Sequence, residues 1–438
     1  MPKIFALIDA NSFYASCEKL FRPDLQKKPV VVLSNNDGCI VSACKLAKQI
    51  PQVKNFLPYY QIRDCLKENG VEVFSSNYAL YADISKRLMN SLAKFSPEME
   101  IYSIDEAFLD LSGILSNGSF EYDYFEYGIK IKNTIEKNIG IPVSVGIATT
   151  KVLAKAANRL AKKNTVGVMD FTNNECRCDV DQMLTKIDVS DLWGIGHRQS
   201  QKLRELAIHN ARDFRDYQNI NLIQKKLTKV GRQIQDELRG NVCFTLEKSP
   251  ADSSFVPRKS ITSSRTFGRP VFSKDELNVA IANYISTAAE KLRKQKSLCR
   301  YLTIYVRTNP FKGIEQYYNF NSTSFLSATN DTRKMIFAAS KLLDKIYRSG
   351  IEYKKCGVIL SDISSENTLQ LSLFEEGDTI KDRLLMKNMD KINTRNGERI
   401  LKVAACGTTD LCTWKMQQQL KSPAYTTRFS ELPIIKLC

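Results

Sequence analysis

The stretch KIFALIDA at residues 3–10 decides the fold, together with the stretch IYSIDEAFLD at residues 101–110. Each contains a short apolar run of the kind that forms a buried strand. Beside the first run stands Asp9, and beside the second stand Asp105 and Glu106. A carboxylate at such a position loses hydration, and neighbouring acids repel each other unless a cation compensates them. We therefore expect the three acids to lie together at adjoining strand ends.

A divalent metal ion is the cation that suits such a group of acids. Mg²⁺ prefers oxygen ligands and binds one or two carboxylates together with substrate phosphates. Only His197 and His209 are present, which excludes a catalytic site built on several histidine ligands. In a two-metal site, one ion activates an attacking oxygen and the other stabilises a leaving oxygen. The dipeptide at 105–106 taken alone is more typical of a surface turn, so the metal site depends on its context.

Strands and helices alternate around these two stretches. Apolar runs at 29–33, 71–74 and 143–148 predict further strands, and helical spacing of apolar residues predicts helices at 77–95 and 150–163. Such interleaving indicates an α/β or α+β module. For the whole chain we expect an α+β fold of several domains.

Residues 171–240 differ from this module, because short helical segments replace the strand patterns. Within them, Gly194 and Gly196 precede a helix at 199–206, which is the pattern of a helix-hairpin-helix element. The two glycines let the backbone approach a DNA phosphate, and the N–H groups at the helix start can bind it. A Gly-x-Gly pair is also a common tight turn, and the pair alone does not decide between the two.

Length and composition limit the possible classes of protein. The 438 residues suggest three or four domains, and 43% hydrophobic and 25% charged residues are typical of globular proteins. Twelve cysteines fit no disulfide framework, the first residues do not resemble a secretion signal, and no apolar run approaches ~18 residues. We therefore expect reduced thiols, no membrane span and a cytoplasmic location.

The net charge of +17 is concentrated in one part of the chain. Residues 1–120 are neutral overall, residues 121–240 carry +5, residues 241–360 carry +11, and the last 78 residues carry +1. A region so rich in Lys and Arg is expected to follow a phosphate backbone and to release its counterions. A solubilising surface is the alternative that charge alone leaves open.

The basic region has the pattern of a compact α+β domain and follows a polar linker. The pattern predicts strands at 260–267, 300–308 and 355–360, and helices at 274–294 and 332–349. Beyond residue 361 the chain becomes polar and irregular, and we expect a docking tail there.

Taken together, the motifs resemble those of Y-family translesion DNA polymerases, most closely the UmuC-type branch. The resemblance rests on FALIDANSFYASCE (5–18), FRPDL (21–25), LSNNDGC (33–39), FSSNY (74–78), YSIDEAF (102–108), WGIG (193–196), AEKLR (289–293) and YTTR (425–428). These stretches cover nearly the whole chain in the expected order, which makes a chance match implausible.

The resemblance implies a right-hand architecture with a ferredoxin-like palm. It implies palm and fingers in 1–170, with the small fingers at about 20–75, and a helical thumb in 171–240 that contains the helix-hairpin-helix. An α+β little finger that binds DNA is implied in 250–360, and a docking tail in 361–438. The implied activity is error-prone, template-directed DNA synthesis past lesions in an SOS-type response to DNA damage. The primer 3′-hydroxyl attacks the α-phosphate of a dNTP, and pyrophosphate leaves.

The resemblance also assigns the site residues at the metal. Asp9, Asp105 and Glu106 become catalytic acids that bind two Mg²⁺ ions, with the carbonyl of Ala10 as a further ligand. The residues implied to bind DNA are Gly194, Gly196, Lys291, Arg293, Lys294 and Lys296.

A second group of residues is implied to bind the incoming nucleotide. Tyr14 matches the steric-gate position, whose ring occupies the place of a ribose 2′-hydroxyl, and Phe13 shapes the same sugar pocket. Lys151, Ser42 and Lys48 are expected to meet the triphosphate. The alternatives are two aromatic rings on the core face of a helix and a solvated lysine.

Residues 43–48 depart from the usual pattern, which leaves the details of triphosphate binding open. Ala43 and Leu46 stand where UmuC-type chains usually carry polar groups, whereas the positive charge at position 48 is kept.

The tail carries the peptide QLSLF at 370–374, which resembles the short motif by which bacterial polymerases bind the β sliding clamp. Gln370 supplies a hydrogen-bonding anchor, and Leu371, Leu373 and Phe374 supply apolar contacts in a pocket. The resemblance adds primer-template DNA, dNTP, a processed UmuD-like protein and a RecA-like filament as partners.

Two other interpretations use the same residues. A metal-dependent nuclease or nucleotidyl cyclase could use the same acids, but it needs neither a steric-gate aromatic nor a clamp peptide. A non-catalytic DNA-binding accessory protein of the same fold is the second alternative, suggested by the atypical stretch at 43–46.

Overall fold

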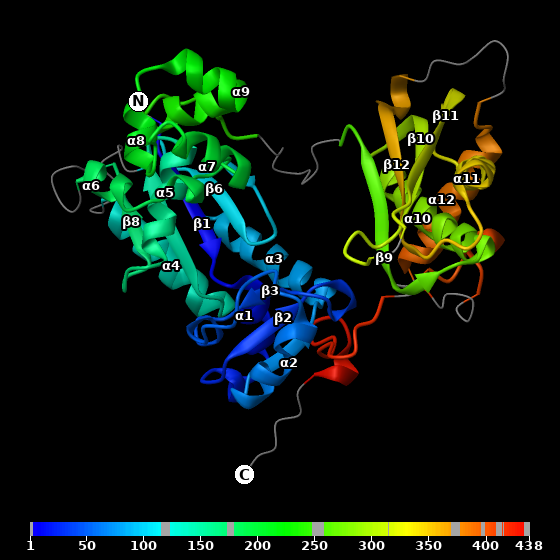
Figure 1. Ribbon diagram of the computed structural model, residues 1–438, viewed down its shortest axis with the longest axis horizontal. Helices are drawn as coiled ribbons and strands as arrows, with labels where there is room; N and C mark the ends of the chain where they lie inside the picture. Colours follow the sequence, from blue (N-terminus) through cyan, green and yellow to red (C-terminus); the bar gives the residue numbers. More distant parts are fainter. Residues whose placement is uncertain are drawn as a thin grey trace. The chain divides into compact units, whose positions relative to one another are not determined.

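The computed structural model describes residues 3–114, 123–172, 179–247, 258–313, 315–368, 377–395, 399–408, 414 and 416–432. The chain forms two units, the first made of 1–34, 38–254 and 420–438 and the second of 35–37 and 255–419. Both units contain helices and sheets (Figure 1), and the α+β class predicted from the sequence is confirmed. No helix in the described ranges is long and apolar enough to cross a membrane.

A five-stranded sheet is the centre of the first unit. Its order is β5 (Met99–Ile101), β6 (Glu106–Asp110), β1 (Phe5–Ala10), β7 (Val143–Ala148) and β8 (Val168–Asp170). The central strand β1 pairs antiparallel with both β6 and β7. Its side chains alternate between two cores, with Ala6 and Ile8 in one and Phe5 and Leu7 in the other.

Two helices cover the opposite faces of this sheet. Helix α4 (Tyr124–Ile139) packs on the side chains of Val145 and Ile147, whereas α5 (Lys151–Ala161) approaches the backbone of Gly146. A Cβ at Gly146 would lie 2.3 Å from the carbonyl of Ala154, so this close approach requires glycine. Asp9 is two residues after Leu7 on β1, so its side chain points to the same face of the sheet as Leu7, the face covered by α5.

A three-stranded sheet follows in the same unit. Its order is β3 (Ile40–Ala43), β2 (Val30–Leu33) and β4 (Glu72–Ser75), and its neighbours are α1 (Phe13–Leu20), α2 (Tyr59–Glu68) and α3 (Tyr78–Leu92). The sequence pattern predicted no strand at 40–43. These residues form one because their backbone pairs with β2, which buries Ile40 and Ala43.

The stretch predicted to be helical, 171–240, contains α6 (Val180–Thr185), α7 (His197–Arg204), α8 (Ala211–Asp216) and α9 (Ile220–Leu238). These helices share a core with α5. A 3₁₀ turn at Val189–Asp191 and a positive φ at Gly194 precede α7. The helix-hairpin-helix assignment stays a prediction.

The second unit has one antiparallel sheet, covered on one face by helices. The strand order is β11 (Tyr318–Thr329), β10 (Ser297–Arg307), β12 (Tyr353–Ser365) and β9 (Ile261–Val271), and the helices are α10 (Lys274–Lys294) and α11 (Thr332–Ile346). The sequence predicted an irregular chain beyond 361. This is wrong for α12 (Ile380–Arg395), a helix that buries Met386 and whose Asp390 pairs with α10.

Candidate active site

Strand pairing brings the three predicted acids together. Asp9 on β1 is the direct cross-strand neighbour of Glu106 on β6, so both side chains lie on the same face of the sheet. Just beyond the pair, the backbone N–H of Ala10 donates to the carbonyl of Asp105 at 2.8 Å. The side chain of Asp105 is oriented by the hydroxyl of Ser103, which donates to Oδ1 at 2.5 Å.

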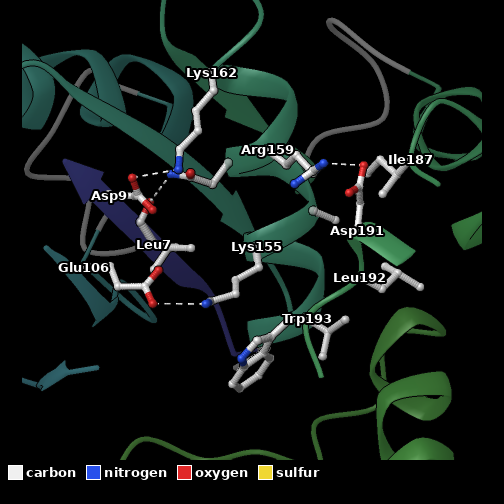
Figure 2. Close-up of a pocket in the computed structure, with 13 residues that line it drawn as sticks. Leu7, Asp9, Glu106, Lys155, Arg159, Lys162, Ile187, Asp191, Leu192 and Trp193 are labelled. Atoms are coloured by element: carbon white, nitrogen blue, oxygen red, sulfur yellow. Dashed lines mark hydrogen bonds and ion pairs between the residues drawn. The ribbon is translucent and has the colours of Figure 1, made fainter. Parts of the chain in front are cut away.

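Two lysines meet this group of acids from the side of α5. Nζ of Lys162 lies 2.7 Å from Oδ1 of Asp9, and Nζ of Lys155 lies 3.1 Å from Oε1 of Glu106 (Figure 2). With Arg159, which pairs with Asp191, these lysines have the spacing of one helix face. Lys155 and Lys162 were not predicted as site residues, because their spacing shows that they share a helix face but not that this face meets the acids. Lys155 and Lys162 line a cavity of about 190 Å³ together with Asp9 and Glu106.

The electrostatics of the acids are dominated by burial. Burial raises the pKa of Asp9, and the negative charge of Asp105 adds to the rise, whereas Lys162 opposes it. Burial also raises the pKa of Glu106, with Asp9 and Asp105 adding to the rise and Lys155 opposing it. The site therefore concentrates negative charge in a place with little water and favours a cation there.

The chemistry of the donors fits Mg²⁺. Three carboxylates and the carbonyl of Ala10 are hard oxygen donors, and the repulsion among the acids is what a bound cation relieves. Within the described ranges, no three His, Cys, Asp or Glu side chains already converge as a metal site. Instead, two of the acids pair with Lys155 and Lys162.

Helix α1 follows β1 directly and places the predicted sugar-pocket aromatics near the acids. Phe13 is buried, whereas Tyr14 is half-buried. The ring of Tyr14 stacks on Tyr81 with centroids 4.5 Å apart and planes 14° apart, and it meets the edge of Tyr78 at 6.0 Å. Burial raises the pKa of Tyr14, and the charges of Tyr78 and Asp105 add to the rise. Tyr14 thus lies between an aromatic cluster and the acids.

The three residues predicted to meet the triphosphate have different surroundings. Nζ of Lys48 donates to the hydroxyl of Ser12 at 3.0 Å. Burial and the charge of Lys162 lower the pKa of Lys48, while Cys44 and Asp9 oppose the fall. Ser42 is buried, and its hydroxyl accepts a bond from α1.

Lys151 is not brought to the acids. Its side chain is only 4% exposed, and Nζ donates to Oε2 of Glu100 at 2.7 Å and to the carbonyl of Thr245 at 3.3 Å. The same ammonium lies 4.7 Å from the centre of the Phe108 ring. Lys151 therefore joins the sheet edge to the 241–247 segment, and its predicted contact with the nucleotide has no support in this geometry.

The residues predicted to bind DNA also have different surroundings. Gly194 has φ +83°, and a Cβ there would lie 2.6 Å from Ile234, so the turn before α7 requires glycine. The N–H of Gly196 donates to the side chain of Gln199 at 2.9 Å. Lys291, Lys294 and Lys296 are exposed.

Arg293 does not project into solvent. Its side chain is 9% exposed and donates two bonds to Asp390 on α12, at 2.6 and 2.8 Å. It also donates to the carbonyl of Asn330 and to the hydroxyl of Thr332. Arg293 thus holds α12 on α10 and is not available to a phosphate. The predicted clamp peptide at 370–374 lies outside the described residues.

Comparisons with known proteins agree with this arrangement. Residues 8–159 match the impB/mucB/samB family, residues 258–373 match its C-terminal domain, and residues 383–435 match a domain of unknown function. "Protein UmuC" of Salmonella typhimurium is 42% identical over 99% of this chain and 100% of its own length. A "DNA polymerase IV" of Clostridium acetobutylicum is 24% identical over 92% of this chain and 97% of its own length.

A solved structure shares the fold. It is a Y-family DNA polymerase chimera with a TM-score of 0.64, 23% identity, and coverage of 83% of this chain and 99% of its own. The likeness supports the predicted fold class, because it extends over both units.

Proposed function

Because the chain belongs to the impB/mucB/samB family, we propose that it is a Y-family, UmuC-like DNA polymerase that copies damaged templates with low fidelity. It transfers a nucleotide from dNTP to the 3′-hydroxyl of a primer, directed by a template strand. The observation that carries this proposal is the pairing of β1 with β6, which sets Asp9 beside Glu106 and next to Asp105. We propose that it acts in the cytoplasm, where its DNA substrate would lie.

Asp9, Asp105 and Glu106 would hold Mg²⁺, with the carbonyl of Ala10 as a further ligand, and we propose two ions. When bound, the metal activates the primer hydroxyl and neutralises the charge that develops on the phosphates. The acids of this chain supply the negative charge and the buried surroundings that favour such a cation.

The side chains around the acids bind and orient the nucleotide. Lys162 pairs with Asp9 and Lys48 contacts Ser12, and in the proposed complex these flexible cations bind triphosphate oxygens. Lys162 takes the role that the sequence analysis gave to Lys151. Tyr14, stacked on Tyr81, blocks the position of a ribose 2′-hydroxyl and so selects deoxynucleotides.

The first unit supplies the proposed palm, fingers and thumb, and the second supplies the proposed little finger. The sheet face of the second unit that its helices leave open carries aromatic and basic side chains. These are Tyr301, Arg307, Tyr318, Phe320 and Lys355. Such a face, together with Lys291, Lys294 and Lys296, suits a phosphate backbone and its bases without reading sequence.

We further propose that the tail binds a β sliding clamp through residues 370–374. A processed UmuD-like protein and a RecA-like filament are proposed partners, on the basis of the relationship to UmuC.

Primer extension with Mg²⁺ and the four dNTPs tests the function, on an undamaged template and on one with an abasic site. The wild-type chain should lengthen the primer on both. Asp105→Asn keeps the volume but weakens metal binding, so extension should fall by several orders of magnitude while DNA affinity is unchanged. Asp110→Asn is the matched control, because Asp110 lies at the other end of β6 and pairs with Lys3.

The same assay separates the alternatives. A nuclease would shorten the primer, and an accessory protein would bind DNA without changing it. A cyclase would consume free nucleotide with no primer present. Full extension by Asp105→Asn would contradict the assignment of the acids.

A further inference from the structure

Helix α1 carries the gate residue on a face that also contacts distant parts of the chain. Tyr14, Glu18 and Phe21 follow at intervals of four and three residues, so their side chains lie along one face. Tyr14 is the gate of the proposed function, whereas the proposed function gives no role to the other two. The contacts of Glu18 and Phe21 therefore show what fixes the position of this face of α1.

Glu18 and Tyr81 form a fully buried pair behind the gate. Both are 0% exposed, and the hydroxyl of Tyr81 donates to Oε1 of Glu18 at 2.6 Å. The ring of Tyr81 is the one on which Tyr14 stacks. Burial raises the pKa of Glu18, and the hydroxyls of Tyr81 and Ser422 oppose the rise. A shift of Glu18 would therefore move the ring that supports Tyr14.

Residues 420–432, which we call the docking segment, lie against this part of the first unit (red in Figure 1). The backbone N–H of Leu420 donates to the hydroxyl of Ser75 at 2.9 Å, and the N–H of Ser75 donates to the carbonyl of Leu420 at 3.0 Å. The side chain of Asn77 donates to the hydroxyl of Ser422 at 2.9 Å. The docking segment thus lies along the connection between the end of β4 and the start of α3.

Tyr425 anchors the docking segment at the C-terminal end of α1, on the residue that directly follows the helix. Its ring is 6% exposed, belongs to the core of the first unit, and stacks on Phe21 with centroids 4.7 Å apart and planes 12° apart. Near the end of the segment, Glu431 accepts a bond from the N–H of Ala424 at 2.6 Å. This bond closes the turn that presents the tyrosine.

We propose that the docking segment positions the steric gate: Ser422 holds the start of α3, which carries Tyr81, through Asn77, and Tyr425 holds the end of α1 through Phe21, so that Tyr14 stays where it excludes ribonucleotides. The inference rests on the proposed polymerase function. It gives a role to part of the region that matches only a domain of unknown function. The residues of the segment are positioning residues, since they act through α1 and α3.

The test compares nucleotide selection in full-length variants. We measure kcat/KM for insertion of a dNTP and of the matching rNTP opposite one undamaged template base, with Mg²⁺. Tyr14→Ala should raise relative use of the rNTP. Tyr425→Ala and Ser422→Ala should raise it by about fivefold, the size expected for one lost hydrogen bond or ring contact. Tyr425→Phe keeps the stacked ring and should retain the wild-type ratio.

A double variant distinguishes positioning from general loss of structure. In combination with Tyr14→Ala, the change Tyr425→Ala should raise rNTP use no further, because both act through one ring. An independent, additive increase would overturn the proposal. If Tyr425→Ala does not fold, Ser422→Ala replaces it in the cycle, because it removes a single hydroxyl.

The outcomes separate this inference from the function on which it rests. A wild-type ratio in Ser422→Ala and Tyr425→Ala, with an altered ratio in Tyr14→Ala, would overturn the inference and leave the polymerase intact. An unchanged ratio in Tyr14→Ala would overturn the gate and the inference together. Absence of any DNA synthesis by the wild-type chain would instead contradict the proposed function.

Discussion

The lysines at the site show how far single residues can be predicted. The apolar runs beside Asp9, Asp105 and Glu106 indicated that the acids lie at strand ends, but their assignment as a metal site rested on the family resemblance, because the dipeptide at 105–106 alone is typical of a surface turn. The resemblance implied that Lys151, at the start of a helix, meets the triphosphate, but its side chain is buried against Glu100, a pairing that depends on tertiary structure. Lys155 and Lys162 lie on the helix face that meets β1 and β6, and that face is known only once the helix is docked.

The first residue-scale prediction concerns Lys162. Lys162→Met removes the charge but keeps much of the length, so KM for dNTP should rise by about tenfold, the effect of one lost charge-assisted bond. Lys163→Met is the matched control, because the next residue is exposed but does not face Asp9, and its KM should stay unchanged. Steady-state insertion kinetics measure both.

Lys151→Met separates the two lysine assignments. It removes the partner of buried Glu100, so the melting temperature should fall while KM for dNTP changes little. A tenfold rise in KM with an unchanged melting temperature would restore the triphosphate role of Lys151.

Glu18 gives a prediction about pH. Its pKa is raised by burial, so the native state holds the proton more tightly than the unfolded chain does. The stabilising contribution of Glu18 is complete below its unfolded pKa of about 4.5 and is lost as pH rises through the folded pKa. Glu18→Gln removes this loss, so its melting temperature should exceed the wild-type value at pH 8 and match it near pH 4.

Thermal unfolding followed by circular dichroism checks this dependence. The amide of Gln still accepts the bond from the Tyr81 hydroxyl, so the variant should keep the wild-type ratio of rNTP to dNTP use. A constant difference in melting temperature across the pH range would show that Glu18 does not titrate in this window.

At the scale of elements, regular patterns were predictable and elements held by tertiary contacts were not. The helix predicted at 274–294 has those bounds in the structure, because its apolar spacing is long and regular. Strand β3 was missed because its short apolar run is interrupted by Ser42, unlike the all-apolar run of β2 with which it pairs. Helix α12 was missed because it buries little apolar surface and is held instead by the pair of Arg293 and Asp390.

The corresponding prediction separates Arg293 from the lysines near it. Arg293→Gln leaves Asp390 without its partner in a mostly buried place, so the free energy of unfolding should fall by about 3 kcal/mol. Changing Lys291, Lys294 and Lys296 to Gln should leave stability nearly unchanged. This triple variant should weaken DNA binding and reduce the log–log salt slope by up to ~3, because each phosphate contact contributes close to one unit.

Urea unfolding and DNA titrations at several salt concentrations measure the two effects. An Arg293→Gln variant that is fully stable but binds DNA with a lower salt slope would restore its predicted role. A triple variant with an unchanged slope would show that these lysines face solvent.

For the whole molecule, the sequence predicted which region carries the positive charge. It did not predict that the C-terminal docking segment returns to the first unit. Most of the basic residues of 241–360 fall within the second unit, whose main part begins at residue 255, together with the open sheet face. The docking segment belongs to the first unit although it follows the second in sequence. Its stacking of Tyr425 on Phe21 joins opposite ends of the chain, and no local pattern marks such a contact.

The last prediction concerns residence on DNA. A polymerase that tolerates lesions gains little binding energy from its template and should dissociate quickly, so attachment to a clamp raises its effective concentration at the primer end. Leu373→Ala with Phe374→Ala removes two apolar anchors, each worth ~1–3 kcal/mol in a buried pocket. Stimulation of primer extension by a β clamp should disappear, while extension without the clamp is unchanged. Undiminished stimulation would contradict the clamp assignment. Loss of basal synthesis would instead mean that the peptide belongs to the folded polymerase, because tethering cannot alter a reaction that is measured without the clamp.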